Sequence, residues 1–138
     1  MKMRIMVDTN IIISASIFPN STIGNVFAHI INNHELVLCK YILKEIEIVF
    51  YKKFSDRIKY LKKFIKDLKY ELLKFEITDF NQYPRIRDIN DIPVLAYAIE
   101  SKVDILLTGD KDFDNIKIGN LKIINPRKYI EDYMKTSN

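Results

Sequence analysis

The sequence has little cysteine, glycine or proline: one cysteine, three glycines and four prolines among 138 residues. A single cysteine excludes an internal disulfide, so a reducing compartment is expected. Cys39 follows the apolar run Leu36-Val37-Leu38, which favours a small buried hydrophobe over a nucleophile. With 48% hydrophobic and 29% charged residues, the composition is that of one globular domain large enough to bury a core.

Long apolar runs are also absent from the sequence. No stretch approaches the roughly 20 residues that a membrane-spanning helix needs. The charged start leads directly into a strand pattern rather than into the apolar centre of a signal peptide. These absences predict a soluble cytoplasmic protein with no membrane association.

The positive charge of the chain is unevenly distributed. The formal net charge is only +4, but residues 40–74 hold eleven basic side chains against five acidic ones. Such an excess attracts polyanions such as RNA through their backbone phosphates. An ordinary amphipathic helix with a solvated lysine face explains the same pattern, so both interpretations stay open. The candidate RNA-binding residues in this segment are Lys52, Lys53, Arg57, Lys62 and Lys63.

Short apolar segments alternate with helical patterns along the chain, which is typical of α/β proteins with a parallel sheet. Strands are predicted at 4–8, 36–39, 75–78, 104–108 and 121–124. Helices are predicted at 10–18, from 21 or 22 onward, and at 41–54, 55–74, 90–101 and 126–134. The alternation predicts a mainly parallel five-stranded sheet in one domain of residues 1–134, followed by a tail at 135–138.

Two of the predicted strands end on a carboxylate. One apolar run leads directly into Asp8, and a second leads through a threonine and a glycine into Asp110. Ligands of open α/β sheets bind at the carboxyl ends of the strands, so these two acids are expected to share an anionic pocket. Each also has a simpler interpretation. Asp8 is suited to cap a helix, and Asp110 to lie in a surface turn with Asp112 and Asp114.

Helical spacing selects two further acids. Asp91 shares a helix face with the apolar residues three, four and seven positions later, so it lies in line with the buried side. Asp88 falls in the preceding loop and is expected to act as an outer helper. Glu45 lies at the edge of the inward stripe of its predicted helix, where a charge needs a partner. A surface salt bridge to a neighbouring lysine is the alternative for Glu45.

Four carboxylates brought together repel one another, so such a pocket either takes up protons or binds cations. All the candidate donors are oxygens, with no cysteine or histidine cluster beside them. Mg²⁺ or Mn²⁺ is therefore expected rather than zinc. The polar residues expected to support the four acids are Thr9, Asn10, Thr108, Asp88 and Asp112.

These acidic segments resemble the motifs of the PIN domain family. The matching segments, in chain order, are Ile5-Met6-Val7-Asp8-Thr9-Asn10, Leu43-Lys44-Glu45-Ile46, Arg87-Asp88-Ile89-Asn90-Asp91 and Leu107-Thr108-Gly109-Asp110-Lys111-Asp112-Phe113. The resemblance covers roughly residues 4–125. It implies a three-layer α/β/α sandwich, a homodimer, and a catalytic metal site formed by Asp8, Glu45, Asp91 and Asp110.

Within that family the chain is most similar to the toxin components of toxin–antitoxin pairs. The resemblance therefore implies a Mg²⁺- or Mn²⁺-dependent endoribonuclease with a cognate antitoxin as its partner. Ile89 and Ile92 stand where related sequences commonly carry proline and a polar residue, but all four acids are present. The alternatives are a DNA-directed nuclease, for which the chain is short, and an inactive module that binds RNA or docks an antitoxin.

Overall fold

The structure is a computed structural model that describes residues 2–135. Its centre is a five-stranded sheet in the order β3-β2-β1-β4-β5, and every neighbouring pair is parallel. The strands are β1 (Arg4–Val7), β2 (Glu35–Leu38), β3 (Glu71–Leu72), β4 (Ile105–Leu107) and β5 (Lys122–Ile124). The predicted α/β class with a parallel five-stranded sheet is confirmed.

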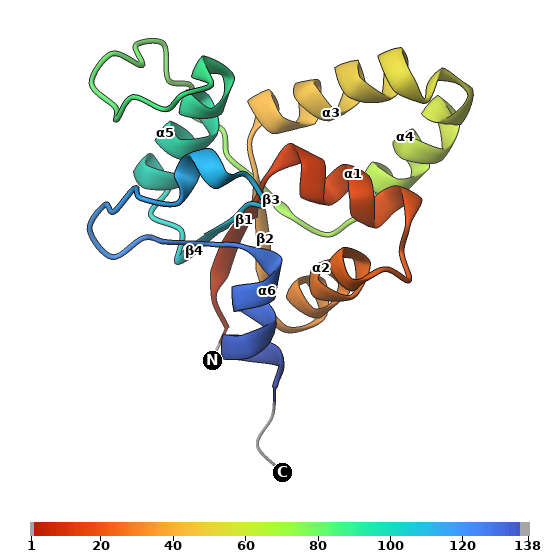
Figure 1. Cartoon of the computed structure of the whole chain (residues 1–138). Coiled ribbons are helices and arrows are strands. Elements are labelled where there is room, and N and C mark those ends of the chain that lie inside the picture. Colours follow the sequence, from red (N-terminus) through yellow and green to blue (C-terminus); the bar gives the residue numbers. More distant parts are fainter. Residues whose placement is uncertain (1, 136–138) are drawn as a thin grey trace.

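Helices cover both faces of this sheet, which makes a three-layer α/β/α sandwich (Figure 1). Right-handed connections place the helices between β1, β2 and β3 on one face and the helix that returns to β4 on the other. The helices are α1 (Thr9–Ile17), α2 (Thr22–Asn33), α3 (Lys40–Lys53), α4 (Ile58–Asp67), α5 (Ile92–Glu100) and α6 (Pro126–Tyr129). A π-helical turn, Ile130–Met134, continues α6. Of the predicted tail at 135–138, residues 136–138 lie outside the described residues.

The third strand lies earlier in the chain than predicted. The sequence predicts a strand at 75–78, but those residues are irregular and the edge strand is Glu71–Leu72. Backbone pairing with β2 fixes this position, since the Leu73 N–H donates to the Leu38 carbonyl at 2.9 Å. So short an edge strand is decided by backbone hydrogen bonds to its neighbour rather than by alternating side chains.

The basic helix predicted at 55–74 is shorter than expected. A 3₁₀ turn at Ser55–Arg57 precedes α4, and α4 ends at Asp67. Leu68 already has extended backbone, with a ψ of 133°. The helix ends there because the following residues must run alongside β2 as the edge strand.

The central strands of the sheet are completely buried. Every residue of β4, and Ile5, Met6 and Val7 of β1, have no exposed surface. Burial on both faces explains why these strands read as continuous apolar runs rather than as alternating patterns. The first polar residues after them therefore emerge from the core at one edge of the sheet.

No single helix in the described part of the chain is long and apolar enough to span a membrane. The helices α1 and α2 satisfy the length and composition only as a pair, and they are bent by 105° relative to each other.

The turn between α1 and α2 is tight. A Cβ on Gly24 would lie 2.4 Å from the Pro19 carbonyl oxygen and 2.6 Å from that of Phe18. The Ser21 hydroxyl caps α2 by accepting from the Gly24 N–H at 3.0 Å. Glycine at this position is what lets the two helices approach.

Replacing Gly24 by alanine is expected to lower the free energy of unfolding by about 1–3 kcal/mol, because the added methyl meets backbone that no side-chain rotation can move. Urea denaturation measures the change. The control is Gly109→Ala, since a Cβ at Gly109 would meet no atom within 4 Å. A Gly24→Ala protein as stable as the wild type would contradict the close approach.

Candidate active site

The candidate site lies where the strand order of the sheet reverses. β1 is followed in the chain by β2 on one side, while its other neighbour, β4, comes much later. Such a reversal opens a crevice at the carboxyl ends of the strands. Asp8 follows β1 directly, and its N–H donates to the Leu107 carbonyl at the end of β4 at 2.9 Å. The pocket predicted from the two strand-terminal acids is therefore in the expected place.

Asp8 is held at the base of the site by two hydrogen bonds. Its Oδ1 accepts from the Thr9 N–H at 2.7 Å, and its Oδ2 accepts from the Thr108 hydroxyl at 2.8 Å. Only 7% of Asp8 is exposed. Burial raises the pKa of this carboxyl, the hydrogen bonds from Thr108 and Thr9 partly offset the rise, and repulsion from Asp110 adds to it.

Two threonines connect Asp8 to the other acids. The Thr9 hydroxyl donates to Glu45 Oε1 on α3, and the Thr108 hydroxyl accepts from the Asp110 N–H at 3.1 Å. Both threonines are buried. The supporting roles expected for Thr9 and Thr108 thus have concrete hydrogen bonds. Asp8 itself also begins α1 as its N-cap, so the simpler interpretation of that residue holds alongside the functional one.

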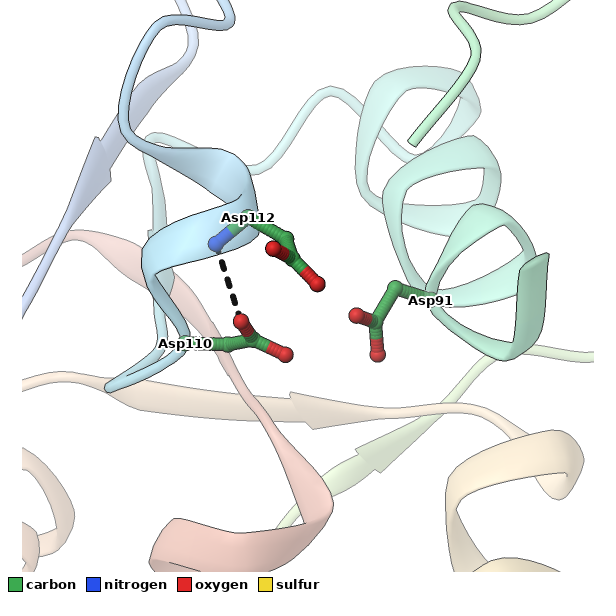
Figure 2. Close-up of side chains that lie close together, drawn as sticks. All are labelled: Asp91, Asp110 and Asp112. Atoms are coloured by element: carbon green, nitrogen blue, oxygen red, sulfur yellow. Dashed lines mark hydrogen bonds between the residues drawn. The ribbon is translucent and has the colours of Figure 1, made fainter. Parts of the chain in front are cut away.

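Three carboxylates face one another across the site (Figure 2). One oxygen from each of Asp91, Asp110 and Asp112 lies within 4.8 Å of the others. Asp110 follows β4, and its Oδ1 accepts from the Asp112 N–H at 2.9 Å, which closes a 3₁₀ turn and brings Asp112 inward. Asp91 faces them from the start of α5, and its buried Oδ2 has no hydrogen-bond partner within the described chain. Asp112, predicted as a supporting residue, belongs to this group.

Negative charge dominates the electrostatics of the site. Burial, together with the neighbouring Asp110, raises the pKa of Asp91 from 3.8 to about 8. The pKa of Glu45 is also raised, mainly by burial, and repulsion from Asp8 contributes. These effects place Asp8, Glu45, Asp91 and Asp110 in one electrostatic field, and Asp8 is the most buried of the four.

Two hollows flank the acids and meet at Gly109 and Asp110. The larger, about 800 Å³, is also lined by Arg87, Asp88, Ile89, Lys111 and Asp112. The smaller, about 260 Å³, is also lined by Asp8, Asn10, Ile11, Ser14 and Ile23. Asp88 is exposed and uses its Oδ1 to accept from the Asn90 N–H at 2.9 Å, which starts the turn that leads into Asp91.

The predicted RNA-binding residues lie apart from these hollows. Lys52 and Lys53 occupy the last turn of α3, whose first half carries Glu45, so about 10 Å of helix separates them from the acids. Arg57, Lys62 and Lys63 lie beyond that end and are exposed, like the two lysines. None of the five lines either hollow beside the acids.

Comparison with known proteins agrees with this geometry. A model of the PIN domain matches residues 4–112. The chain belongs to the PIN domain family. The uncharacterized protein MJ1680 of Methanocaldococcus jannaschii is 32% identical over 150 residues, which cover 97% of this chain and 94% of that protein. The crystal structure of VapBC2 from Rickettsia felis, bound to a DNA fragment from their promoter, matches in fold with a TM-score of 0.67. This match covers 89% of the present chain and 98% of the chain in that structure, and the two sequences are 22% identical.

PIN domains are typically nucleases, and the acids of this PIN domain fit a hard divalent cation. All the donors are carboxylate oxygens, which suit Mg²⁺ or Mn²⁺. An octahedral ion with bonds of about 2.1 Å holds neighbouring ligands about 3.0 Å apart and opposite ligands about 4.2 Å apart, so oxygens that lie within 4.8 Å of one another would close around it on binding. The unpartnered Oδ2 of Asp91 is available as a ligand.

Sequence reasoning missed Tyr41, which holds the Asp91 segment of this PIN domain. The Tyr41 hydroxyl, from the first turn of α3, donates to the Asn90 carbonyl at 2.9 Å. Burial raises the pKa of this hydroxyl to about 12, and repulsion from Glu45 and Asp91 contributes. It therefore stays a donor at all ordinary pH values. A tyrosine in the first turn of a helix carries no pattern that would have singled it out in the sequence.

An Asp91→Asn substitution is expected to stabilise the metal-free PIN domain. The folded protein keeps a proton on Asp91 up to about pH 8, whereas the unfolded chain loses it near the ordinary pKa of 3.8. Wild-type stability therefore falls as pH rises from about 4 through 8. The asparagine variant lacks that slope and should melt about 3 °C higher at pH 8, with little difference at pH 4.

Thermal unfolding across this pH range measures the effect. Asp56→Asn serves as the control, because Asp56 is an exposed acid in the turn before α4. Parallel wild-type and Asp91→Asn curves would contradict the raised pKa of Asp91.

A Tyr41→Phe substitution is expected to weaken Mn²⁺ binding by about 10-fold, since outer partners that orient ligands commonly contribute that much. Titration of free Mn²⁺ by electron paramagnetic resonance gives the affinity. Tyr51→Phe is the matched control, because Tyr51 lies on the same helix and is 72% exposed. Unchanged Mn²⁺ affinity in the Tyr41 variant would show that the Asn90 contact does not position Asp91.

Proposed function

We propose that this PIN domain is a Mg²⁺- or Mn²⁺-dependent endoribonuclease that hydrolyses RNA phosphodiester bonds. The observation that carries the proposal is the facing group of Asp91, Asp110 and Asp112, with one unpartnered oxygen, at the strand-order reversal of a PIN fold. A group of this kind binds hard cations, and such cations also bind substrate phosphates.

Asp91 and Asp110, with Asp8 and Glu45 as the other predicted ligands, would hold the ion, and Asp112 joins Asp91 and Asp110 in the facing group. A bound divalent ion supplies a water of lowered pKa and offsets the charge that develops on the scissile phosphate. Thr108 keeps Asp110 in place through the Asp110 N–H and keeps Asp8 in place through its own hydroxyl. Thr9 keeps Glu45 pointed at the same region. Asp91 would have to be deprotonated to act as a ligand, and its unpartnered Oδ2 would be available to the ion.

We assign the enzyme to the toxin half of a toxin–antitoxin pair. The four motif segments resemble those of PIN toxins, and one solved structure of similar fold is that of VapBC2 from Rickettsia felis. On this proposal a cognate antitoxin restrains the nuclease, the protein acts in the cytoplasm, and two copies form a homodimer. The exposed basic residues Lys52, Lys53, Arg57, Lys62 and Lys63 are candidates for outlying contacts with RNA.

Cleavage of labelled single-stranded RNA tests the proposed activity. The wild type should cleave with Mg²⁺ or Mn²⁺ and stop when EDTA is added, and Asp110→Asn should reduce the rate by at least about 100-fold. Asp56→Asn, far from the site, should cleave normally. Activity that survives EDTA would overturn the metal requirement. Cleavage of single-stranded DNA in preference to RNA would favour a DNA-directed nuclease, and Mn²⁺ binding with no cleavage of either would favour an inactive binding module.

A further inference from the structure

Gly109 is a glycine that neither the backbone nor the packing of this chain requires. Its φ lies outside the left-handed region, and a Cβ built on it would meet no atom within 4 Å. Gly24 shows the contrast, because its Cβ would collide with backbone. Where a protein leaves a glycine uncrowded and conventionally folded, close approach by something outside the chain is a physical reason for it.

Gly109 also stands where the two hollows meet. It lines both of them, together with Asp110, directly after Thr108. Because they share these two lining residues, the hollows adjoin at Gly109 and Asp110. A Cβ at Gly109 would stand at this junction without meeting any protein atom within 4 Å.

The larger hollow has features that suit a backbone phosphate and an unstacked base of RNA. Arg87 and Lys111 line it and form no ion pair among the residues that the structure describes. They stand beside carboxylates that would otherwise repel a polyanion, so their charges are available for backbone phosphates. Ile89, 74% exposed on the same wall, offers an apolar surface to an unstacked base.

The smaller hollow adds neutral polar groups. Asn10 and Ser14 lie one turn apart on α1 and offer an amide and a hydroxyl on the same wall. Ile11 and Ile23 provide the apolar part of the lining. Apolar surface in both hollows suits a strand whose bases are free to contact it, because a duplex hides its bases.

We propose that single-stranded RNA crosses the acidic site over Gly109, with its phosphates held by Arg87 and Lys111 on one side and by Asn10 and Ser14 on the other. This inference rests on the proposed ribonuclease function and adds the path of its substrate. Gly109 keeps the path open, and the two basic residues offset the repulsion between the phosphates and the acids.

The graded series Gly109→Ala and Gly109→Val tests the path. Fluorescence anisotropy gives the affinity for a short labelled single-stranded RNA. Ca²⁺ replaces Mg²⁺ in this experiment so that binding is measured without cleavage. Affinity should fall modestly for alanine and about 10-fold for valine, since small displacements of a bound strand have large effects. For Gly109→Ala the melting temperature and the Mn²⁺ affinity should stay at wild-type values, because its Cβ meets no atom within 4 Å. The same two measurements on Gly109→Val show that its weaker RNA binding arises without loss of the fold or of the metal site.

The salt dependence of the same binding tests the two basic residues. The double variant Arg87→Gln, Lys111→Gln should reduce the slope of log affinity against log salt by about 1.4, at about 0.7 for each lost single-strand phosphate contact. Lys2→Gln is the control, because Lys2 is exposed and precedes the amino end of β1, whereas the acids follow the carboxyl ends of the strands. It should leave the slope unchanged.

The outcomes separate the path from the function. The proposed path would be contradicted if the Gly109→Val protein bound RNA as tightly as the wild type, or if the double variant kept the wild-type salt slope. Neither result would contradict the proposed nuclease activity. Tighter binding of a duplex RNA than of the single strand would also overturn it. A wild-type protein that neither binds nor cleaves RNA would overturn the proposed function itself.

Discussion

The burial of mutually repelling carboxylates at the carboxyl ends of the strands is the constraint on which this structure depends. Burial, together with repulsion from neighbouring acids, raises the pKa of Asp8, Glu45 and Asp91, and that of Asp91 rises to about 8. Nothing in a fold gains stability from such a group by itself. The arrangement makes physical sense when a divalent cation neutralises it, and the all-oxygen donor set suits such a cation.

The surrounding fold holds the acids against that repulsion. Parallel pairing of β1 with β4 brings Asp8 and Thr108 together, and the two threonines then fix the carboxylates of Asp8 and Glu45 and the backbone of Asp110. Tyr41 holds the opposite wall through the Asn90 carbonyl. The sheet thus provides rigid attachment for one set of acids, while a single tyrosine links the helix of Glu45 to the segment of Asp91.

The sequence predicts the buried strands and the amphipathic helices, because their apolar residues follow the regular spacing of each element. Buried strands and amphipathic helices are encoded locally, so β1, β4 and the inward edge of α3 with Glu45 were predictable. The edge strand at Glu71–Leu72 was not, because its position depends on hydrogen bonds to β2. The position of Asp112 facing Asp91 is also not predictable, because nothing in the sequence shows that a 3₁₀ turn brings it there.

The most direct test of the central claim is the number of protons released when Mn²⁺ binds. Isothermal titration calorimetry at pH 7, repeated in buffers with different ionisation enthalpies, gives that number. The account predicts the release of about one proton per ion, because Asp91 must lose its proton to become a ligand. A binding heat that is the same in every buffer would show that no proton leaves, and would contradict a site built on mutually repelling carboxylates.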